Sequence, residues 1–217
     1  MKPLTERQQQ RREAILEAAR RLIGERGLEG VNMRDLAREG GVTPKTLYHQ
    51  FGNKEQLLQV AVEERFRAVY QVITDEPIEH GIDRLFQIID VISATTAANL
   101  EYAKALVPYM HSDRDSALST IRQSAYRDAV LAIAQEGDIL PWMDVELLID
   151  VVYGEVTGIS HLRWYEADTP DNPTFSLLKL ELALILRSVT RGYTHAQATT
   201  TIESLQALLL SGGRPKR

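Results

Sequence analysis

The sequence predicts an all-α protein, in which an N-terminal helix-turn-helix domain is followed by a larger helical domain. Hydrophobic residues make up 44% of the 217 residues but aromatic residues only 6%, and Leu, Ala and Ile are the commonest apolar types. This composition favours helices over sheets. Apolar residues also recur at helical spacing along most of the chain, which indicates helices with one buried face.

The first expected element is a helix from about Thr5 to Glu25. Gly27 and Gly30 follow it and mark its end, because glycine commonly follows the last helical residue. Its apolar positions share one face and predict the side that packs on the rest of the domain. They are Ile15, Ala18, Ala19, Leu22 and Ile23.

Residues 33 to 58, MRDLAREGGVTPKTLYHQFGNKEQLL, have the pattern of two short helices joined by a tight turn. Ala37, Gly41 and Leu47 lie at offsets of four and then six residues. The small residue permits a close helix crossing, the glycine permits the turn, and the leucine packs back on the first helix. A helix held in this way can lie in the major groove of DNA.

The ends of these helices carry recognisable capping residues. Asn32 is a favourable N-cap for the first short helix. Thr43 is a favourable N-cap for the second, and Pro44 falls at its first helical position, where a missing N–H costs nothing. Asn53 caps the next helix, with Gln56 three residues later as in a capping box.

The next helix is expected from Asn53 to about Thr74, so that it begins in the helix-turn-helix domain and enters the body. The body is also expected to be helical, with a linker over residues 167–173. Its expected helices are 82–100, 101–110, 116–135, 142–166, 174–191 and 195–210.

Two segments, RREAILEAARRLIGERGLEGVNMRDLA and GVTPKTLYHQFGNKEQLL, together resemble the TetR family of bacterial transcriptional regulators. The run from Thr46 to Glu55 resembles that family's recognition helix and the start of its fourth helix. The resemblance covers residues 10–60, about a quarter of the chain. Gly40 is one departure, because the family more often has alanine there.

The resemblance implies a DNA-binding head over residues 5–69, whose last helix continues into an effector-binding and dimerisation domain over residues 70–217. It implies a homodimeric regulator that binds a palindromic operator in double-stranded DNA. A repressor released by an unknown small-molecule effector is the expected form. An activator, or a helical ligand-binding or adaptor protein with a vestigial head, is the alternative.

The expected DNA contacts lie on the recognition helix and at neighbouring helix starts. Lys45 can donate to guanine and Thr46 can touch a thymine methyl, since both are near the end of the helix that meets base edges. Lys54 is at a helix start, where phosphates bind. A solvated surface position is the alternative for each polar residue. The full set is Asn32, Thr43, Lys45, Thr46, Tyr48, His49 and Lys54.

Aromatic and polar residues on the apolar helices are candidates for effector contacts, although each could instead be a core or dimer contact. Glu155 lies on the stripe of Leu148, Val152 and Ile159, where a carboxylate needs a partner. That partner could be a cationic effector, an arginine or water. The candidates are Phe66, Phe86, Tyr102, Tyr109, Tyr126, Tyr153, Glu155, His161 and Trp164.

Two body helices favour a homodimer over a monomer. The helix beginning at Thr174 is apolar nearly all round, so more than one side of it should be buried. The preceding helix carries two glycines one turn apart, and each costs ~1 kcal/mol in a helix interior, so close packing or a bend is expected there. We expect both helices to pair with their copies across a two-fold axis. The expected interface residues are Gly154, Gly158, Leu178, Leu182 and Ile185.

Charge is divided unevenly along the chain. The net charge is −5, but residues 1–56 hold 11 Lys or Arg against 8 Asp or Glu. A mildly basic head on an acidic body suits docking against phosphates. The longest stretch without a charged residue is 11 residues, whereas a membrane span needs ~20 apolar residues. The N-terminus also lacks the pattern of a signal peptide, so we expect a cytoplasmic protein without a membrane partner.

Several classes of site are not expected. The chain has no cysteine, which removes disulfides and thiolate metal sites. No His pair is spaced i,i+4 and no Glu precedes a His by three, so the helical metal motifs are missing from the sequence. No metal, cofactor or nucleophile–base pair is expected, and an enzyme is the weakest alternative.

Overall fold

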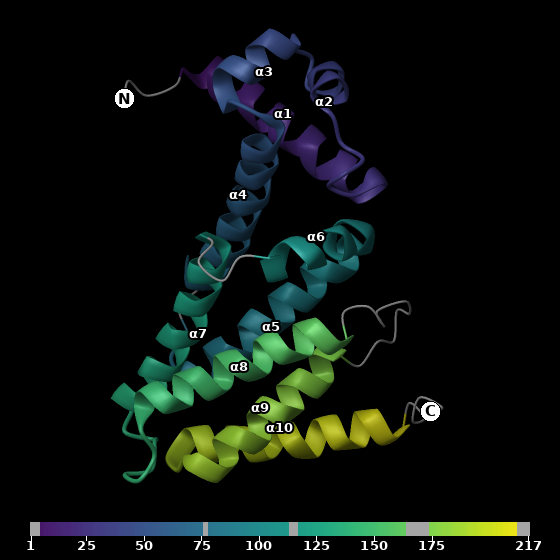
Figure 1. Ribbon diagram of the computed structural model, residues 1–217. Coiled ribbons are helices and arrows are strands. Elements are labelled where there is room, and N and C mark those ends of the chain that lie inside the picture. The colour runs from purple at the N-terminus through teal and green to yellow at the C-terminus, as the bar shows by residue number, and fades with distance from the viewer. Residues whose placement is uncertain (1–4, 76–77, 113–116, 164–173, 212–217) are drawn as a thin grey trace. The chain divides into compact units, whose positions relative to one another are not determined.

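The computed structural model describes residues 5–75, 78–112, 117–163 and 174–211. These residues form ten α-helices (Figure 1), and their one β-type pairing is an isolated bridge between Ile139 and Thr190. The predicted all-α fold class is therefore confirmed. The helices are α1 Glu6–Arg26, α2 Met33–Glu39, α3 Pro44–Phe51, α4 Lys54–Asp75, α5 Gly81–Ala98, α6 Leu100–Ser112, α7 Ala117–Gln135, α8 Val145–Arg163, α9 Thr174–Val189 and α10 Gly192–Ser211.

Two helix starts differ from the sequence prediction, and side-chain caps explain both. α8 begins at Val145 rather than Trp142, because the Asp144 carboxylate accepts a hydrogen bond from the Leu147 N–H at 2.9 Å and so caps the helix there. α10 begins at Gly192 rather than three residues later. Its cap comes from a distant loop, since the buried Asp138 carboxylate accepts from the Thr194 N–H at 2.7 Å.

The chain forms two compact units, and each unit combines two stretches that are separated in the sequence. The head unit is Met1–Ala68 with Ala98–Leu118, and the body unit is Val69–Ala97 with Ser119–Arg217. α6 thus belongs with α1 to α3 in the head unit. The sequence prediction divided the chain after residue 69 and so placed this helix in the second domain. α4 is one continuous helix that contributes its first turns to the head unit and its last turns to the body unit.

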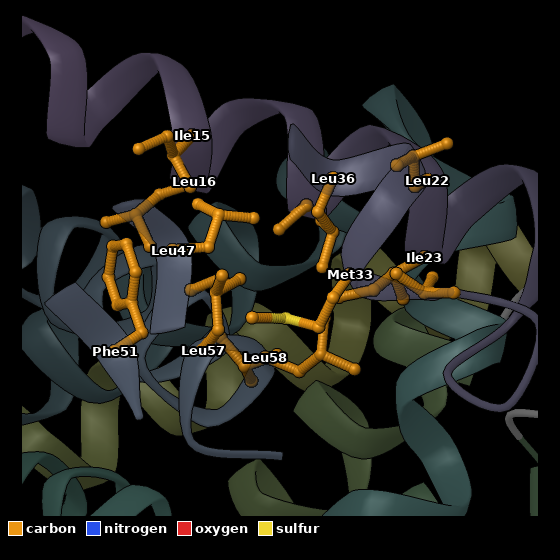
Figure 2. Packing of buried hydrophobic residues seen from close by; sticks show 14 of the residues in the cluster. Ile15, Leu16, Leu22, Ile23, Met33, Leu36, Leu47, Phe51, Leu57 and Leu58 are labelled. Carbon is orange, nitrogen blue, oxygen red and sulfur yellow. The ribbon is translucent and has the colours of Figure 1, made fainter. Parts of the chain in front are cut away.

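The head unit is organised around one buried apolar cluster. Figure 2 shows Leu16 of α1, Met33 of α2, Leu47 of α3 and Leu57 of α4 meeting in this cluster. Tyr102 of α6 joins it from the side of α1. α1 and α6 approach closely at Gly24, where an added Cβ would lie 3.5 Å from the Tyr102 backbone nitrogen. The helix-turn-helix is therefore built on a single core with α6 as its additional support.

The body unit is held together by close contacts between helices and by a loop that is hydrogen-bonded to the α9–α10 junction. α9 packs along α10 (Figure 1). α5 starts directly against α7, since a Cβ on Gly81 would lie 2.5 Å from the carbonyl oxygen of Ala129. The loop after α7 is fixed to the α9–α10 junction, because the Leu140 N–H donates to the Val189 carbonyl at 2.9 Å. In the part of the chain that the structure describes, no helix is long and apolar enough to cross a membrane.

Candidate nucleic-acid interface

The recognition helix α3 has one buried and one exposed face. Leu47 and Phe51 are buried in the head core. On the opposite side Lys45, Tyr48 and His49 are exposed, and Tyr48 keeps 54% of its surface accessible. Within the described residues these three side chains make no hydrogen bond or ion pair, so their polar groups are free to meet a partner outside the chain.

The turn before α3 is shaped by glycine. Gly41 has φ +63°, a left-handed conformation that other residues adopt with strain. The next residue returns the chain to α2, since the Val42 N–H donates to the Ala37 carbonyl at 2.9 Å. Gly40 allows α2 to lie close to α1, because an added Cβ would come 3.0 Å from the Cγ1 atom of Ile15. This departure from the family pattern therefore has a packing reason in this chain.

The three predicted N-caps in this region are confirmed. The Asn32 side-chain oxygen accepts from the Asp35 N–H at 2.9 Å, and its amide donates to the Asp35 carboxylate at 2.9 Å. The Thr43 hydroxyl accepts from the Thr46 N–H at 3.2 Å. Asn53 caps α4 by accepting from the Gln56 N–H at 2.8 Å. Both short helices, and the helix after them, thus start at defined residues.

Many arginines of the head unit are paired with acidic side chains. Arg12 pairs with Glu64 at 2.6 Å, and its guanidinium lies 5.7 Å from the centroid of the Phe51 ring. The hydrogen bond that Arg12 donates to Glu64 raises the Arg12 pKa. Arg26 pairs with Asp35 at 2.6 Å. Partial desolvation works against ionisation of Asp35, but the neighbouring arginines outweigh it and lower the pKa of this carboxyl. These arginines stabilise the head and are less available to phosphates.

Three unpaired cations at helix starts define the candidate interface. In the described residues Lys45 of α3 and Lys54 at the start of α4 have no acidic partner. Arg34, in the first turn of α2, is exposed and also lacks one, and it was missed by the sequence prediction. Its position two residues after the Asn32 cap was the available signal, because helix starts bind phosphate. The three cations lie at the first turns of three consecutive helices, which is the arrangement for contacting a phosphate backbone.

The predicted effector contacts that the structure describes are divided between the two units. Phe66 and Tyr102 pack in the head core, because α6 belongs to the head unit. Tyr126 is buried in the body unit, and Tyr153 lies close enough to affect its ionisation. Glu155 is only half-buried, so water can solvate it. Trp164 lies outside the described residues, as do the side chains of Tyr109 and His161.

Phe86 instead lines an open groove between α5, α9 and α10, with a volume of about 470 Å³. The charged groups that line this groove all have partners among the described residues. Lys179 bonds Asp90 at 2.7 Å and lies 5.3 Å from the centroid of the Phe86 ring, and the Tyr193 hydroxyl donates to Asp83 at 2.9 Å. In the part of the chain that the structure describes, the groove therefore offers a ligand uncharged polar side chains such as Gln87 and Thr201, but no unpaired charge.

The predicted interface residues fall into two groups. Leu178 and Leu182 are buried within the single chain, with 4% and 0% of their surface exposed, so they face the interior of the body unit. Ile185 is half-buried. Gly154 and Gly158 are open, since an added Cβ at either would meet no described atom within 4 Å.

Comparison with known proteins places these features in context. Residues 15–61 match the family described as bacterial regulatory proteins, tetR family. The chain is 27% identical over 164 residues to the HTH-type transcriptional regulator UidR of Escherichia coli (strain K12), a match that covers 68% of this chain and 81% of that protein. It is 24% identical over 169 residues to the HTH-type transcriptional repressor KstR2 of Mycolicibacterium smegmatis, covering 74% of this chain and 82% of that protein.

A similar fold occurs in the crystal structure of the transcriptional regulator FadR from Bacillus subtilis in complex with stearoyl-CoA. The TM-score is 0.60 at 19% identity, and the match covers 78% of this chain and 97% of that chain. The similarities therefore extend over most of the chain and are not confined to the helix-turn-helix.

Proposed function

We propose that this chain, which belongs to the TetR family of bacterial regulatory proteins, is a homodimeric transcriptional repressor that a small-molecule effector releases from a palindromic operator. The observation that carries the proposal is the exposed face of α3. Lys45, Tyr48 and His49 point away from a core that holds the other face of the same helix. A rigid helix with a free cationic and aromatic face suits reading of the major groove.

The other expected contacts have positions consistent with phosphate binding. Thr43 and Asn32 are N-caps, and Lys54 lies at a helix start, so each is next to backbone N–H groups that can bind an oxyanion. Thr46 is half-buried and shares a hydrogen bond with the Thr43 hydroxyl at 2.9 Å. We add Arg34 to this set. In this arrangement α3 reads bases while the flanking helix starts fix its register on the backbone.

A two-fold symmetric operator requires two copies of the head. We propose that the copies associate through a stripe on α8, formed by Leu147, Val151, Gly154 and Gly158. These positions lie at successive spacings of four, three and four residues, which places them on one helix face. Leu147 and Val151 keep 57% and 40% of their surface exposed in the single chain. Exposed apolar side chains beside open glycines suit close packing against a second helix.

Effector release is proposed as a shift between two arrangements of the dimer. α4 is the connecting element. It follows the recognition helix after only two residues, Gly52 and Asn53, and it ends in the body unit. An effector that displaces the end of α4 would change the spacing of the two recognition helices. Half-sites lie ~34 Å apart on DNA, so a few ångströms of splay would prevent both from docking. FadR holds stearoyl-CoA, which supports a small-molecule site in a protein of this fold.

The first test is binding of the purified full chain to DNA from upstream of its own gene and its neighbours, with competitor DNA and rising salt. We expect salt-sensitive binding that protects a two-fold symmetric site. The double variant Lys45→Ala with Tyr48→Ala should bind roughly 10- to 100-fold more weakly while remaining a dimer. Arg67→Ala, which removes an exposed cation of α4, should change affinity much less.

The proposal fails if the folded wild-type dimer shows no sequence preference on genomic DNA at physiological salt. It also fails if the double variant binds the protected site as tightly as the wild type does. In the first case the chain would be a helical ligand-binding or adaptor protein whose head no longer reads DNA. In the second case the protein would read DNA through groups other than the exposed face of α3.

A further inference from the structure

One arginine of the body unit is buried without an anionic partner. Arg122 of α7 keeps 8% of its surface exposed. Its Nη2 donates to the Tyr153 hydroxyl at 3.3 Å, its guanidinium lies 5.6 Å from the centroid of the Tyr153 ring, and its Nε has no hydrogen-bond partner. No carboxylate of the described residues pairs with it. Burying an ionised group in this way is costly unless something neutralises it.

The groups around Arg122 are tyrosines from three helices. Besides Tyr153 of α8 they are Tyr70 of α4 and Tyr126 of α7, both buried. Burial raises the pKa of both hydroxyls, and the charge of Arg122 lowers each in part, so Arg122 is within electrostatic range of both. The Tyr70 hydroxyl lies near Tyr126 but forms no hydrogen bond of normal geometry. Among the described residues the cluster therefore holds one unpaired cation and neutral hydroxyl donors, with no acceptor for Nε.

The geometry of the guanidinium selects a class of ligand. Nε and Nη2 lie on the same edge of the guanidinium, and this edge matches a carboxylate through two parallel hydrogen bonds. One positive charge surrounded by neutral tyrosines matches a single negative charge. The aromatic rings suit an organic body attached to that charge. The groove between α5, α9 and α10 offers no comparable group, because its Lys179 is already paired with Asp90.

We propose that Arg122, with the hydroxyls of Tyr70 and Tyr153, binds the carboxylate of an organic acid, and that such an acid is the effector. This inference rests on the proposed function. Tyr70 lies in the part of α4 that belongs to the body unit, and the earlier turns of the same helix belong to the head unit. An acid held by Arg122 and Tyr70 therefore contacts the helix that is proposed to transmit release.

The test uses the full chain and measures its thermal unfolding at pH 7 with 10 mM octanoate, benzoate or phenylacetate, each against its primary amide as an uncharged control. We expect at least one acid to raise the Tm by about 3 °C and its amide to have no effect. Arg122→Met should abolish this rise. Arg122→Lys should weaken binding of the acid on the order of tenfold, because an ammonium cannot form the two parallel hydrogen bonds that a guanidinium donates to a carboxylate. Arg127→Met, which removes an exposed arginine of the same helix, should respond like the wild type.

Ligand-free variants provide a second readout. Arg122→Met should unfold at the wild-type Tm or above it, because it removes an uncompensated buried charge. A fall of more than about 5 °C would mean that the cation–aromatic contact with Tyr153 is structural, and it would overturn the inference. The inference is also overturned if none of the acids stabilises the wild type, or if Arg122→Met retains the acid effect.

Binding to the protected operator separates this inference from the proposed function. If wild-type protein binds the operator and no acid stabilises or releases it, the carboxylate site is refuted and the DNA-binding proposal stands. If an acid stabilises the wild type through Arg122 but the protein binds no DNA, the carboxylate site stands as a ligand site and the regulator proposal is refuted.

Discussion

The two glycines of α8 provide a direct test of the proposed dimer. In the single chain a Cβ on Gly154 or Gly158 would meet no described atom within 4 Å, so alanine fits both positions without a clash. Each glycine lies inside a helix, where alanine is more favourable by roughly 0.5–1 kcal/mol. The double variant Gly154→Ala with Gly158→Ala should therefore stabilise an isolated chain by about 1–2 kcal/mol.

The same substitutions should have the opposite effect on the proposed dimer. Two substitutions in a two-fold symmetric interface add four methyl groups to one contact. Overpacking costs roughly 1–3 kcal/mol per site. At the lower end, four methyls cost about 4 kcal/mol, which corresponds to a Kd for dimerisation about 10³-fold weaker.

Sedimentation equilibrium over a concentration series would give this Kd, and urea unfolding at low concentration would give the stability of the chain. Gly24→Ala is the matched control. It lies inside α1, and its added Cβ would be at an ordinary contact distance of 3.5 Å from Tyr102. We expect the control to dimerise like the wild type. A double variant that is more stable as a chain but dimerises with an unchanged Kd would refute the assignment of this helix face to the interface.

Three further predictions concern stability. Leu47→Ala empties a fully buried position under α3, so it should cost about 3–4 kcal/mol in urea unfolding and weaken operator binding. Asp138→Ala removes the cap of α10 and should cost about 1–2 kcal/mol, whereas exposed Asp128→Ala should leave the stability nearly unchanged. Burial raises the pKa of Tyr102 to about 12, above the value of about 10 in an unfolded chain, so its stabilising contribution is complete below pH 10 and is lost as the pH rises toward 12. Tyrosinate absorbance and circular dichroism should therefore show this tyrosine ionising with unfolding; its ionisation near pH 10 in a folded chain would contradict its burial.

The candidate DNA interface was predictable because its information is local. Caps, a turn glycine and alternating buried and exposed positions lie within a few residues of one another, and the structure has Asn32, Thr43 and Asn53 capping the expected helices. Arg34 could have been included on the same reasoning, since it follows a cap. Which arginines are unpaired was not predictable, because the partner of Arg12 is Glu64, 52 residues away.

The body site was less predictable because its groups come from distant segments. Arg122, Tyr126, Ala129 and Ile133 share one face of α7, so the sequence did hold a signal that a charged residue lies on an apolar stripe. The partner on that face could not be read from α7 itself. Tyr70 reaches it from α4 and Tyr153 from α8, and neither spacing is encoded in a local pattern.

By itself, the sequence determined the helices, the helix-turn-helix and the exposed residues of α3, since helix periodicity, capping and turn formation depend on near neighbours along the chain. The tertiary structure decided that α6 packs in the head unit and that Leu178 and Leu182 face inward. It also decided that Arg122 is buried with no carboxylate partner among the described residues. These outcomes depend on which helix faces meet, and that is set by packing between segments far apart in the chain. A side chain's burial and its charge partners follow from this packing.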